Sequence, residues 1–385
     1  MLADLRVLDF TTTIAGPHAT RLLADLGARV VKIESTEGDL LRHRPPIRQG
    51  ASSYFGALNA GKRSMVVDLK RPEGVAVVRR LVARSDLVVE NFRPGVMARL
   101  GLGYRELRAI RADLVYCAMS GYGQTGPSAG LPAYAPSIHA ASGYDLAHLS
   151  YQGDRGRPDA CGVFVGDVLL GTYAFGAIMT ALFHRRATGE GQMIDVSMLE
   201  SMLTLMLTEV QRTQFPVPPP GRPMFGPLQT RDGYVMLAVA SERTFADLCG
   251  AAGHEEWRVD PRFARYADRR ANWHLFIEEL EGWSRQLTTA ECQARFDEAG
   301  VPASPYRTVD EALADPQLTH RQALGEVRDG GGTFRAVNPP YRFSAAPAHL
   351  QPFAPALGEH TDEILAAAGY ARDEIAALRQ AQVVA

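Results

Sequence analysis

The sequence predicts an α/β fold with an open, doubly wound, Rossmann-like parallel sheet, joined to a smaller α+β domain. Two observations lead to this prediction. In the first third of the chain, short apolar runs typical of strands alternate with amphipathic helical runs, and the connections are short. Such alternation is typical of right-handed crossovers and of a parallel sheet covered on both faces. A proline-rich segment at 215–223 then separates this part from a second series of elements.

The elements of the first domain follow from the spacing of their apolar side chains. Short apolar runs predict strands at 5–10, 28–34, 64–69, 87–90 and 114–119. Apolar residues three and four apart predict helices at 18–26, 72–85 and 104–111. We expect a long helix at 168–186, a strand at 193–196 and a helix at 198–213 to follow.

Segments rich in proline and glycine divide the chain into three parts. Residues 1–215 are predicted to form the large domain and residues 226–325 the small domain. The small domain is expected to contain a strand at 233–240 and helices at 242–252, 273–286, 289–299 and 309–314. A second linker near 329–332 leads to residues 335–385, whose amphipathic helices at 361–368 and 372–379 should complete the large domain.

The composition indicates a globular protein and argues against several kinds of partner and binding site. Of 385 residues, 46% are hydrophobic and 22% charged, and the net charge of -2 argues against nucleic-acid binding. The four cysteines form no Cys-x-x-Cys pair, which predicts a reducing, cytoplasmic location. The histidines show no metal-binding spacing, so no metal site is expected. The most apolar candidate for a membrane span, 163–183, contains Asp167, and we expect no span there.

Two glycine motifs resemble nucleotide-binding loops but lack the required context. Residues 56–62 begin like a P-loop, yet Arg63 stands where the magnesium-binding Ser or Thr belongs, and a strand follows instead of a helix. Residues 121–126 have the Gly-x-Gly-x-x-Gly spacing, but prolines at 127 and 132 prevent the helix that would hold a pyrophosphate. We therefore expect neither ATP nor NAD to bind.

A single carboxylate marks the start of the long apolar helix. Asp167 follows Gly166 and lies between the apolar runs 161–165 and 168–170. An Asp is favoured there because it accepts the free N–H groups of the first turn and interacts with the positive helix end. A carboxylate in apolar surroundings can also act as a nucleophile toward an acyl group or as a base. These arguments leave both an ordinary helix cap and a catalytic residue open.

A series of motifs along the chain resembles one enzyme family. In order, the motifs are Leu-Arg-Val-Leu-Asp-Phe at 5–10, Ala-Gly-Pro at 15–17, residues 23–34, Gly-Asp at 38–39, residues 58–64, Val-Glu-Asn-Phe-Arg-Pro-Gly at 89–95, residues 120–127, Gly-Asp at 166–167, residues 188–192 and Gly-Glu-His-Thr at 358–361. Together they resemble the class III coenzyme A-transferases, which include formyl-CoA transferase and the carnitine CoA-transferases. The resemblance implies an interlocked homodimer, with acyl-CoA and a carboxylic acid as substrates and no permanently bound cofactor. It also implies that Asp167 accepts the acyl group and then carries CoA as an aspartyl thioester.

The same resemblance implies which residues bind CoA. Asn91, Phe92 and Arg93, at the end of the fourth expected strand, would lie along the CoA molecule. Lys62 and Arg63 would be further phosphate contacts. The alternative for each basic residue is an ordinary solvated surface charge.

The resemblance also implies which residues surround the reacting acyl group. Ile14, His18 and Tyr54 would line the substrate site, and Tyr134 would donate a hydrogen bond during catalysis. Their alternatives are an ordinary helix start for His18 and a core aromatic for Tyr54. Ile14 replaces a Gln of formyl-CoA transferase, and Ala135 replaces the acid beside its Tyr, so a larger acyl group than formyl or oxalyl is expected. Succinyl-CoA as donor follows from the family alone.

The related α-methylacyl-CoA racemases provide the alternative function. They share the Asp but remove the proton α to the thioester, with a His as the opposite base. Tyr134 stands where that His is expected, and a Tyr with a pKa of ~10 is a poor base at neutral pH. His139, five residues later, could replace it only if the local backbone shifts. The sequence therefore favours CoA transfer.

Overall fold

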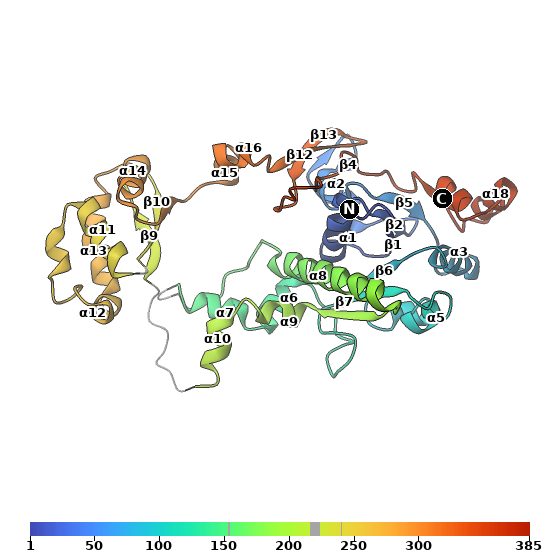
Figure 1. Ribbon diagram of the computed structural model, residues 1–385, viewed down its shortest axis with the longest axis horizontal. Helices are drawn as coiled ribbons and strands as arrows, with labels where there is room; N and C mark the ends of the chain where they lie inside the picture. Colours follow the sequence, from blue (N-terminus) through green and yellow to red (C-terminus); the bar gives the residue numbers. More distant parts are fainter. Residues whose placement is uncertain (153–154, 216–223, 240) are drawn as a thin grey trace. The chain divides into compact units, whose positions relative to one another are not determined.

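A computed structural model describes residues 1–152, 155–215, 224–239 and 241–385 (Figure 1). Within these ranges the chain forms two compact units, unit 1 with residues 1–145, 159–210 and 317–385, and unit 2 with residues 146–158 and 211–316. Apart from Phe215, the proline-rich segment 215–223 lies outside the described residues. Residues 317–325 belong to unit 1, whereas the sequence assigns them to the small domain.

Unit 1 is built around a six-stranded parallel sheet. Its strands are β1 (Arg6–Asp9), β2 (Arg29–Glu34), β5 (Arg63–Val66), β6 (Leu87–Glu90), β7 (Val115–Ser120) and β8 (Met193–Ser197). Their order is β5-β2-β1-β6-β7-β8, and all neighbours are parallel. The chain moves outward from β1 to β5 on one side and from β6 to β8 on the other. The prediction of a doubly wound parallel sheet is therefore confirmed.

Helices cover both faces of this sheet. Those that precede the C-terminal segment are α1 (Ala15–Asp25), α2 (Ser53–Asn59), α3 (Pro72–Val82), α4 (Val96–Arg99), α5 (Tyr104–Arg108), α6 (Ala135–Ala141), α8 (Val165–Thr188) and α9 (Met198–Leu203). Two further helices, α7 (Tyr144–Leu149) and α10 (Leu207–Arg212), contain residues of both units. Successive strand residues point to opposite faces, so Val7 packs in the core that holds α1 and α8, and Leu8 packs in the core that holds α3. Figure 1 shows α1 beside α8.

The long helix α8 is half buried. By length and composition alone it could cross a membrane. One side packs into the core through Leu170, Ala174 and Ile178, while Val168 and Phe183 are exposed. The buried side is that of a core helix lying against a sheet. Asp167, on which the prediction of no membrane span is based, lies in the first turn of this helix.

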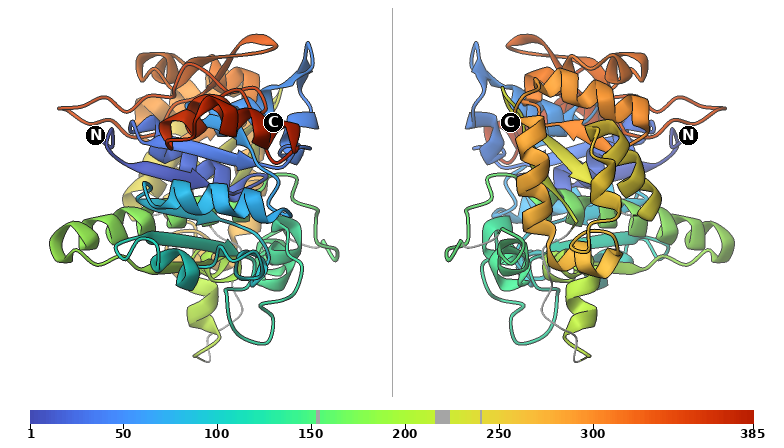
Figure 2. Two further views of the ribbon diagram at one scale, coloured as in Figure 1. Left: turned by 90° about the vertical axis from the view of Figure 1, so that its right-hand side faces the viewer. Right: turned by 90° about the vertical axis from the view of Figure 1, so that its left-hand side faces the viewer.

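The C-terminal segment belongs to unit 1. It contains the hairpin β12 (Leu324–Asp329) and β13 (Gly332–Val337) and the helices α17 (Thr361–Ala367) and α18 (Arg372–Gln380). Leu365 and Ile375 lie in the same core as Val78 of α3. Figures 1 and 2 show α17 and α18 close to α3, where Arg80 donates a hydrogen bond of 3.0 Å to the carbonyl of Ala368, 288 residues away.

Unit 2 combines a small antiparallel sheet with helices. The strands β9 (Phe225–Gln229), β10 (Tyr234–Ala238) and β11 (Ala303–Pro305) have the order β11-β10-β9. The helices that follow β10 in this unit are α11 (Glu242–Ala252), α12 (Tyr266–Ala271), α13 (Trp273–Ser284), α14 (Thr289–Ala299) and α15 (Val309–Leu313). Helix α16 (Pro316–His320) comes next in the chain, and all of it except Pro316 belongs to unit 1. Helix α14 begins where predicted because Thr288 and Glu291 form a capping box.

Two local predictions are corrected by the structure. The helix expected at 198–213 is divided into α9 and α10. Helix α2, which the sequence analysis did not predict, begins after Ser52, whose hydroxyl accepts the N–H of Phe55 at 3.2 Å. A Ser three residues before a buried Phe is the capping signal that could have revealed it. The short hairpin β3 (Ile47–Arg48) and β4 (Ala51–Ser52) precedes this helix.

Candidate active site

A cavity of about 340 Å³ lies at the carboxyl edge of the parallel sheet, where β1 and β6 are neighbours. The chain leaves these strands toward opposite sides, and doubly wound sheets bind ligands at such a switch point. The lining residues are Phe10, Thr12, Ile33, Glu34, Ser35, Gly38, Asp39, Val67, Asp68, Leu69, Lys70, Phe92, Val96 and Leu100. Most of them follow the ends of β1, β2, β5 and β6.

The cavity combines apolar walls with the acidic residues Glu34, Asp39 and Asp68 and the basic Lys70. Glu34 is paired with Arg42, and Asp39 with Lys32. Phe92, predicted to lie along CoA, is in the wall. Lys70 also lines the cavity and is exposed, so its ammonium group can reach an anionic ligand. Neither Thr12 nor Lys70 was among the predicted CoA-binding residues, although Lys70 belongs to one of the motifs, Asp-Leu-Lys at 68–70, that resemble the family. The feature that could have identified both residues is their position just after the carboxyl ends of two expected strands.

Asp167 lies in the first turn of α8 but is not its N-cap. The helix begins at Val165 with Phe164 as N-cap, so the predicted capping role of Asp167 is corrected. The carboxyl group is partly exposed. Burial raises its pKa from 3.8 to about 6, and a backbone hydrogen bond from Ala15 acts in the opposite direction. The carboxylate is therefore ionised at neutral pH, yet poorly solvated.

A close approach of α1 and α8 brings Ala15 to Asp167. A Cβ atom on Gly171, one turn after Asp167, would lie 2.5 Å from the carbonyl oxygen of Ala15 and 2.9 Å from Cδ2 of His18. Only a glycine at this position lets the start of α1 lie directly against α8. The N-terminal end of α1, with its free N–H groups and positive dipole end, is thereby held next to the carboxylate.

Three of the predicted substrate residues lie in this region. His18 is within 3.5 Å of the hydroxyl of Thr172, and burial, together with the charges of Arg21 and Lys62, lowers its pKa to about 4. Its imidazole is therefore neutral. Tyr54, in α2, is half-buried, and burial and the negative charge of Asp167 raise the pKa of its hydroxyl. Ile14 is half-buried and is the N-cap residue of α1, directly before Ala15.

His139 holds the residue that precedes Asp167. Its ring, 1% exposed, accepts a hydrogen bond of 3.0 Å at Nε2 from the N–H of Gly166. Its Nδ1 is buried and has no hydrogen-bond partner among the described residues. Burial lowers the pKa of His139, as an accepting nitrogen requires. Neither nitrogen faces solvent as a proton-transfer base would.

Tyr134, predicted to donate a hydrogen bond during catalysis, lies at the start of α6. It is the N-cap residue of α6 and 72% exposed, and its backbone N–H is bonded to the hydroxyl of Ser137. Among the described hydrogen bonds and ring contacts, none joins Tyr134 to Asp167. Its predicted role in catalysis remains a prediction.

The prediction that Lys62 binds a CoA phosphate is corrected, because its side chain is completely buried. The ammonium group donates hydrogen bonds of 2.9 Å to Asp9 and Asn59 and of 3.1 Å to the carbonyl of Pro17. Burial alone would raise the pKa of Asp9, but the charges of Lys62 and Lys32 lower it to about 2. Lys62 therefore supports the start of α1 from inside the molecule.

The other predicted CoA contacts are also engaged elsewhere or lie on the surface. Asn91 exchanges two hydrogen bonds of 2.9 Å with the backbone of Thr12, which uses both ends of its amide. Arg63 pairs with Glu363 at 2.6 Å. Arg93 is exposed in the turn after β6 and is not among the residues that line the 340 Å³ cavity.

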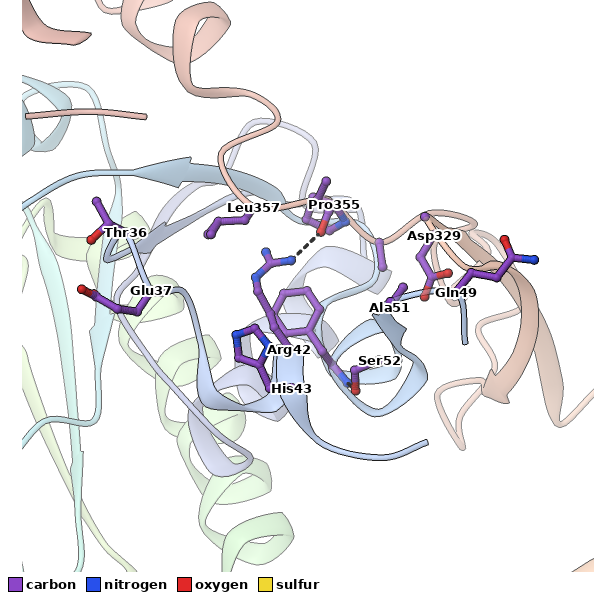
Figure 3. A pocket seen from close by; sticks show the side chains of 15 residues that line it. Thr36, Glu37, Arg42, His43, Gln49, Ala51, Ser52, Asp329, Pro355 and Leu357 are labelled. Atoms are coloured by element: carbon purple, nitrogen blue, oxygen red, sulfur yellow. Dashed lines mark hydrogen bonds between the residues drawn. The ribbon is translucent and has the colours of Figure 1, made fainter. Parts of the chain in front are cut away.

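A second cavity, of about 660 Å³, lies beyond the loop that follows β2. Figure 3 shows it between residues 36–55 and the C-terminal residues 329–357. Arg42 points into it, donates to the carbonyl of Pro355 at 3.1 Å and is paired with Glu34 at 2.7 Å. Asp329 is paired with Arg48 at 2.9 Å. These two ion pairs neutralise the charges of Arg42 and Asp329, whereas Glu37 and His43 also line the cavity.

Within the described residues, no group of three or more His, Cys, Asp or Glu side chains could hold a metal ion.

Comparison with known proteins decides the family. A family model described as CoA-transferase family III matches residues 2–361. The chain belongs to CoA-transferase family III. This family III CoA-transferase is 34% identical to a succinate–glutarate CoA-transferase of Agrobacterium fabrum, with 95% of each chain covered. It is 35% identical to a succinyl-CoA–D-citramalate CoA-transferase of Chloroflexus aurantiacus, over 100% of this chain and 98% of the relative.

Solved structures agree with this assignment. A crystal structure of a CAIB/BAIF family protein from Brucella suis superposes on this CoA-transferase with a TM-score of 0.83 and 34% identity, covering 94% of this chain and 98% of that one. The chain therefore has the same α/β fold as this CAIB/BAIF family protein, with a central parallel sheet.

Proposed function

We propose that this enzyme moves CoA from an acyl-CoA donor to a free carboxylic acid through an aspartyl-CoA thioester on Asp167. The observation that carries the proposal is the carboxyl group of Asp167 itself. It is partly exposed, poorly solvated, and next to the N–H of Ala15 at the start of α1. A desolvated carboxylate is a stronger nucleophile than one in bulk water.

The proposed steps balance without ATP, metal or redox change. The Asp167 carboxylate attacks the thioester carbonyl, the C–S bond breaks, and CoA leaves as a thiolate, which gives a mixed anhydride. The thiolate then attacks the aspartyl carbonyl, and the donor acid leaves as its carboxylate. The acceptor carboxylate repeats these steps in reverse. The N–H groups at the start of α1 are suited to stabilise the oxyanion that develops on the Asp167 carbonyl.

The substrates are proposed from the cavity and from the relatives. The 340 Å³ cavity has apolar walls for a flat ring, and Lys70 can contact a phosphate of CoA. The named relatives use succinate, glutarate and citramalate or their thioesters. We propose succinyl-CoA as the donor and a dicarboxylic acid as the acceptor, with acyl-CoA bound as a substrate and no resident cofactor.

Racemisation of a 2-methylacyl-CoA is the less supported alternative. That reaction needs a second base opposite Asp167. His139, the candidate base, uses Nε2 to accept the N–H of Gly166 and has a buried Nδ1. Incubation with a 2-methylacyl-CoA in deuterium oxide tests it, since α-deuterium uptake at the rate of turnover would establish racemase activity.

A homodimer, interlocked as in the class III family, is proposed as the working form. Val168, Tyr173 and Phe183 of α8 are 47%, 44% and 76% exposed in the single chain, which favours a partner over this helix. Light scattering after gel filtration measures the mass directly. A cytoplasmic location remains a prediction from the four cysteines, which are all free.

The decisive experiment follows CoA exchange by mass spectrometry across a panel of acyl-CoAs and free acids. Hydroxylamine added during turnover should convert the thioester at Asp167 into a hydroxamate, which peptide mapping locates. Asp167→Asn should abolish both exchange and labelling. Full activity of this variant would exclude the covalent mechanism.

A further inference from the structure

The loop that joins β1 to α1 contains a strained residue. Thr13 has a φ of +63°, in the left-handed region. For a β-branched residue this conformation is a genuine outlier, which persists only when surrounding contacts enforce it. Thr13 stands two residues before Ala15, whose carbonyl oxygen lies directly against Gly171, one turn after Asp167 in α8.

Side chains from elsewhere hold the backbone of this loop at each of its three threonines. Asp9 accepts the N–H of Thr11 at 2.9 Å, and Lys32 donates to the Thr11 carbonyl at 2.7 Å. Asn91 accepts the N–H of Thr12 and donates to its carbonyl, each at 2.9 Å.

Asp39 completes the set. Both of its carboxylate oxygens, at 3.3 and 3.2 Å, accept the N–H of Thr13. Asp39 is 1% exposed and pairs at 3.0 Å with Lys32, which is fully buried. The same carboxylate caps the 3₁₀ turn η1 (Leu40–His43) by accepting the N–H of Leu41 at 2.9 Å. Four buried or half-buried side chains, those of Asp9, Lys32, Asp39 and Asn91, therefore hold one strained turn.

We propose that Asp39, Lys32 and Asn91 are positioning residues that keep Thr13 in its left-handed conformation and thereby hold the N–H of Ala15 against Asp167. This inference rests on the proposed function of Asp167. It gives Asn91 a role other than the CoA contact expected from the family resemblance, because both ends of its amide are used by Thr12. A displaced Ala15 N–H would leave the developing oxyanion without its donor, so the loss should fall on turnover and not on CoA binding.

A double-mutant cycle tests the inference. Asn91→Leu removes both hydrogen bonds to Thr12 and should lower kcat for CoA exchange by about 10- to 100-fold, with KM for acyl-CoA changed less than about twofold. Thr13→Gly removes the penalty of the left-handed conformation, so Asn91→Leu/Thr13→Gly should recover about tenfold of the lost kcat. A loss with a structural cause alone would show no such recovery.

Asn338→Leu is the matched control. Asn338 also bonds backbone on both sides, donating to the Gln322 carbonyl at 2.8 Å and accepting the Leu350 N–H at 3.0 Å. This variant should lose stability without loss of kcat. Amide hydrogen exchange of a peptide covering residues 10–18 should increase in Asn91→Leu but not in Asn338→Leu.

The outcomes separate the two proposals. A rise in KM in place of the fall in kcat, no recovery with Thr13→Gly, or unchanged exchange of residues 10–18 would each overturn the positioning role. If the wild-type enzyme exchanges no CoA, the proposed function fails, and hydrogen exchange still decides whether Asn91 holds the loop.

Discussion

His139 Nε2 accepts the backbone N–H of Gly166 at 3.0 Å, so a histidine of α6 caps the helix that carries Asp167. The N-cap residue of α8, Phe164, provides no side-chain hydrogen bond. A Cβ atom on Gly166 would lie 3.2 Å from this nitrogen, tighter than most side-chain contacts. The imidazole ring of His139 therefore packs directly against Gly166 in the first turn of α8.

We expect His139→Leu to destabilise the protein and to slow turnover. The leucine leaves the N–H of Gly166 buried without an acceptor, which costs about 1–3 kcal/mol. His139→Gln can present an amide oxygen to the same N–H and should retain most of the stability and of kcat. Urea unfolding and CoA exchange measure both effects. Equal losses in the two variants would contradict this role for the hydrogen bond.

Asp167→Asn should stabilise the enzyme at high pH while abolishing its activity. Burial raises the pKa of Asp167 from 3.8 to about 6. The protonated form is thus favoured in the folded state, and the resulting stability is complete below pH 3.8 and lost as the pH rises through about 6. Asparagine does not ionise and therefore does not lose this stability. The free energy of unfolding of Asp167→Asn should exceed that of the wild type by about 1–2 kcal/mol at pH 8, allowing for partial solvation, and the difference should vanish near pH 4.

Unfolding of both variants at pH 4.5 and pH 8 checks this prediction. In the wild type, kcat/KM should fall with decreasing pH around 6, because the nucleophile must be ionised. A stability difference that is the same at both pH values would show that Asp167 is not desolvated.

The sheet was predictable from local patterns. Val7, Val30 and Val88 lie in apolar runs because parallel strands are buried on both faces. The place of Asp167 at the start of an apolar helix left a helix cap and a catalytic residue both open, and only the family resemblance favoured a catalytic role. In contrast, Lys62 resembles a surface charge in sequence, and only its contact with Asp9, 53 residues away, shows that it is buried.

The conformation of the loop before α1 also could not be predicted from the local sequence. Nothing in the sequence around Thr13 indicates a left-handed conformation, since glycine or asparagine is the usual signal. Its cause lies in Asp39 and Asn91, which come from other strand ends and meet the loop only in the folded chain. Long-range hydrogen bonds of this kind leave no periodic pattern.

Arg80 should stabilise the docking of the C-terminal helices. Its guanidinium group lies 4.1 Å from the ring centroid of Tyr370 and donates to the carbonyl of Ala368 at 3.0 Å. We expect Arg80→Ala to lower the free energy of unfolding by about 1–2 kcal/mol through loss of both contacts. Arg108→Ala, at an exposed position of α5, is the control and should have little effect. A similar loss in both variants, measured by thermal unfolding, would exclude this role.

Lys70, rather than Arg63, should bind the negative charge of CoA. Lys70 lines the 340 Å³ cavity and is exposed, whereas Arg63 is paired with Glu363 at 2.6 Å. Lys70→Ala should raise KM for acyl-CoA by about 5- to 10-fold with little change in kcat, because a phosphate contact made equally in the ground and transition states affects binding alone. Arg63→Ala, which removes the same charge outside the cavity wall, should change KM by less than about twofold.

The effect of Lys70→Ala should shrink as salt is raised from 20 to 500 mM, since a phosphate contact at an exposed lysine is screened. If Arg63→Ala gave the larger rise in KM, or if the Lys70→Ala effect were independent of salt, CoA would have to bind with its phosphates elsewhere than at this edge of the sheet.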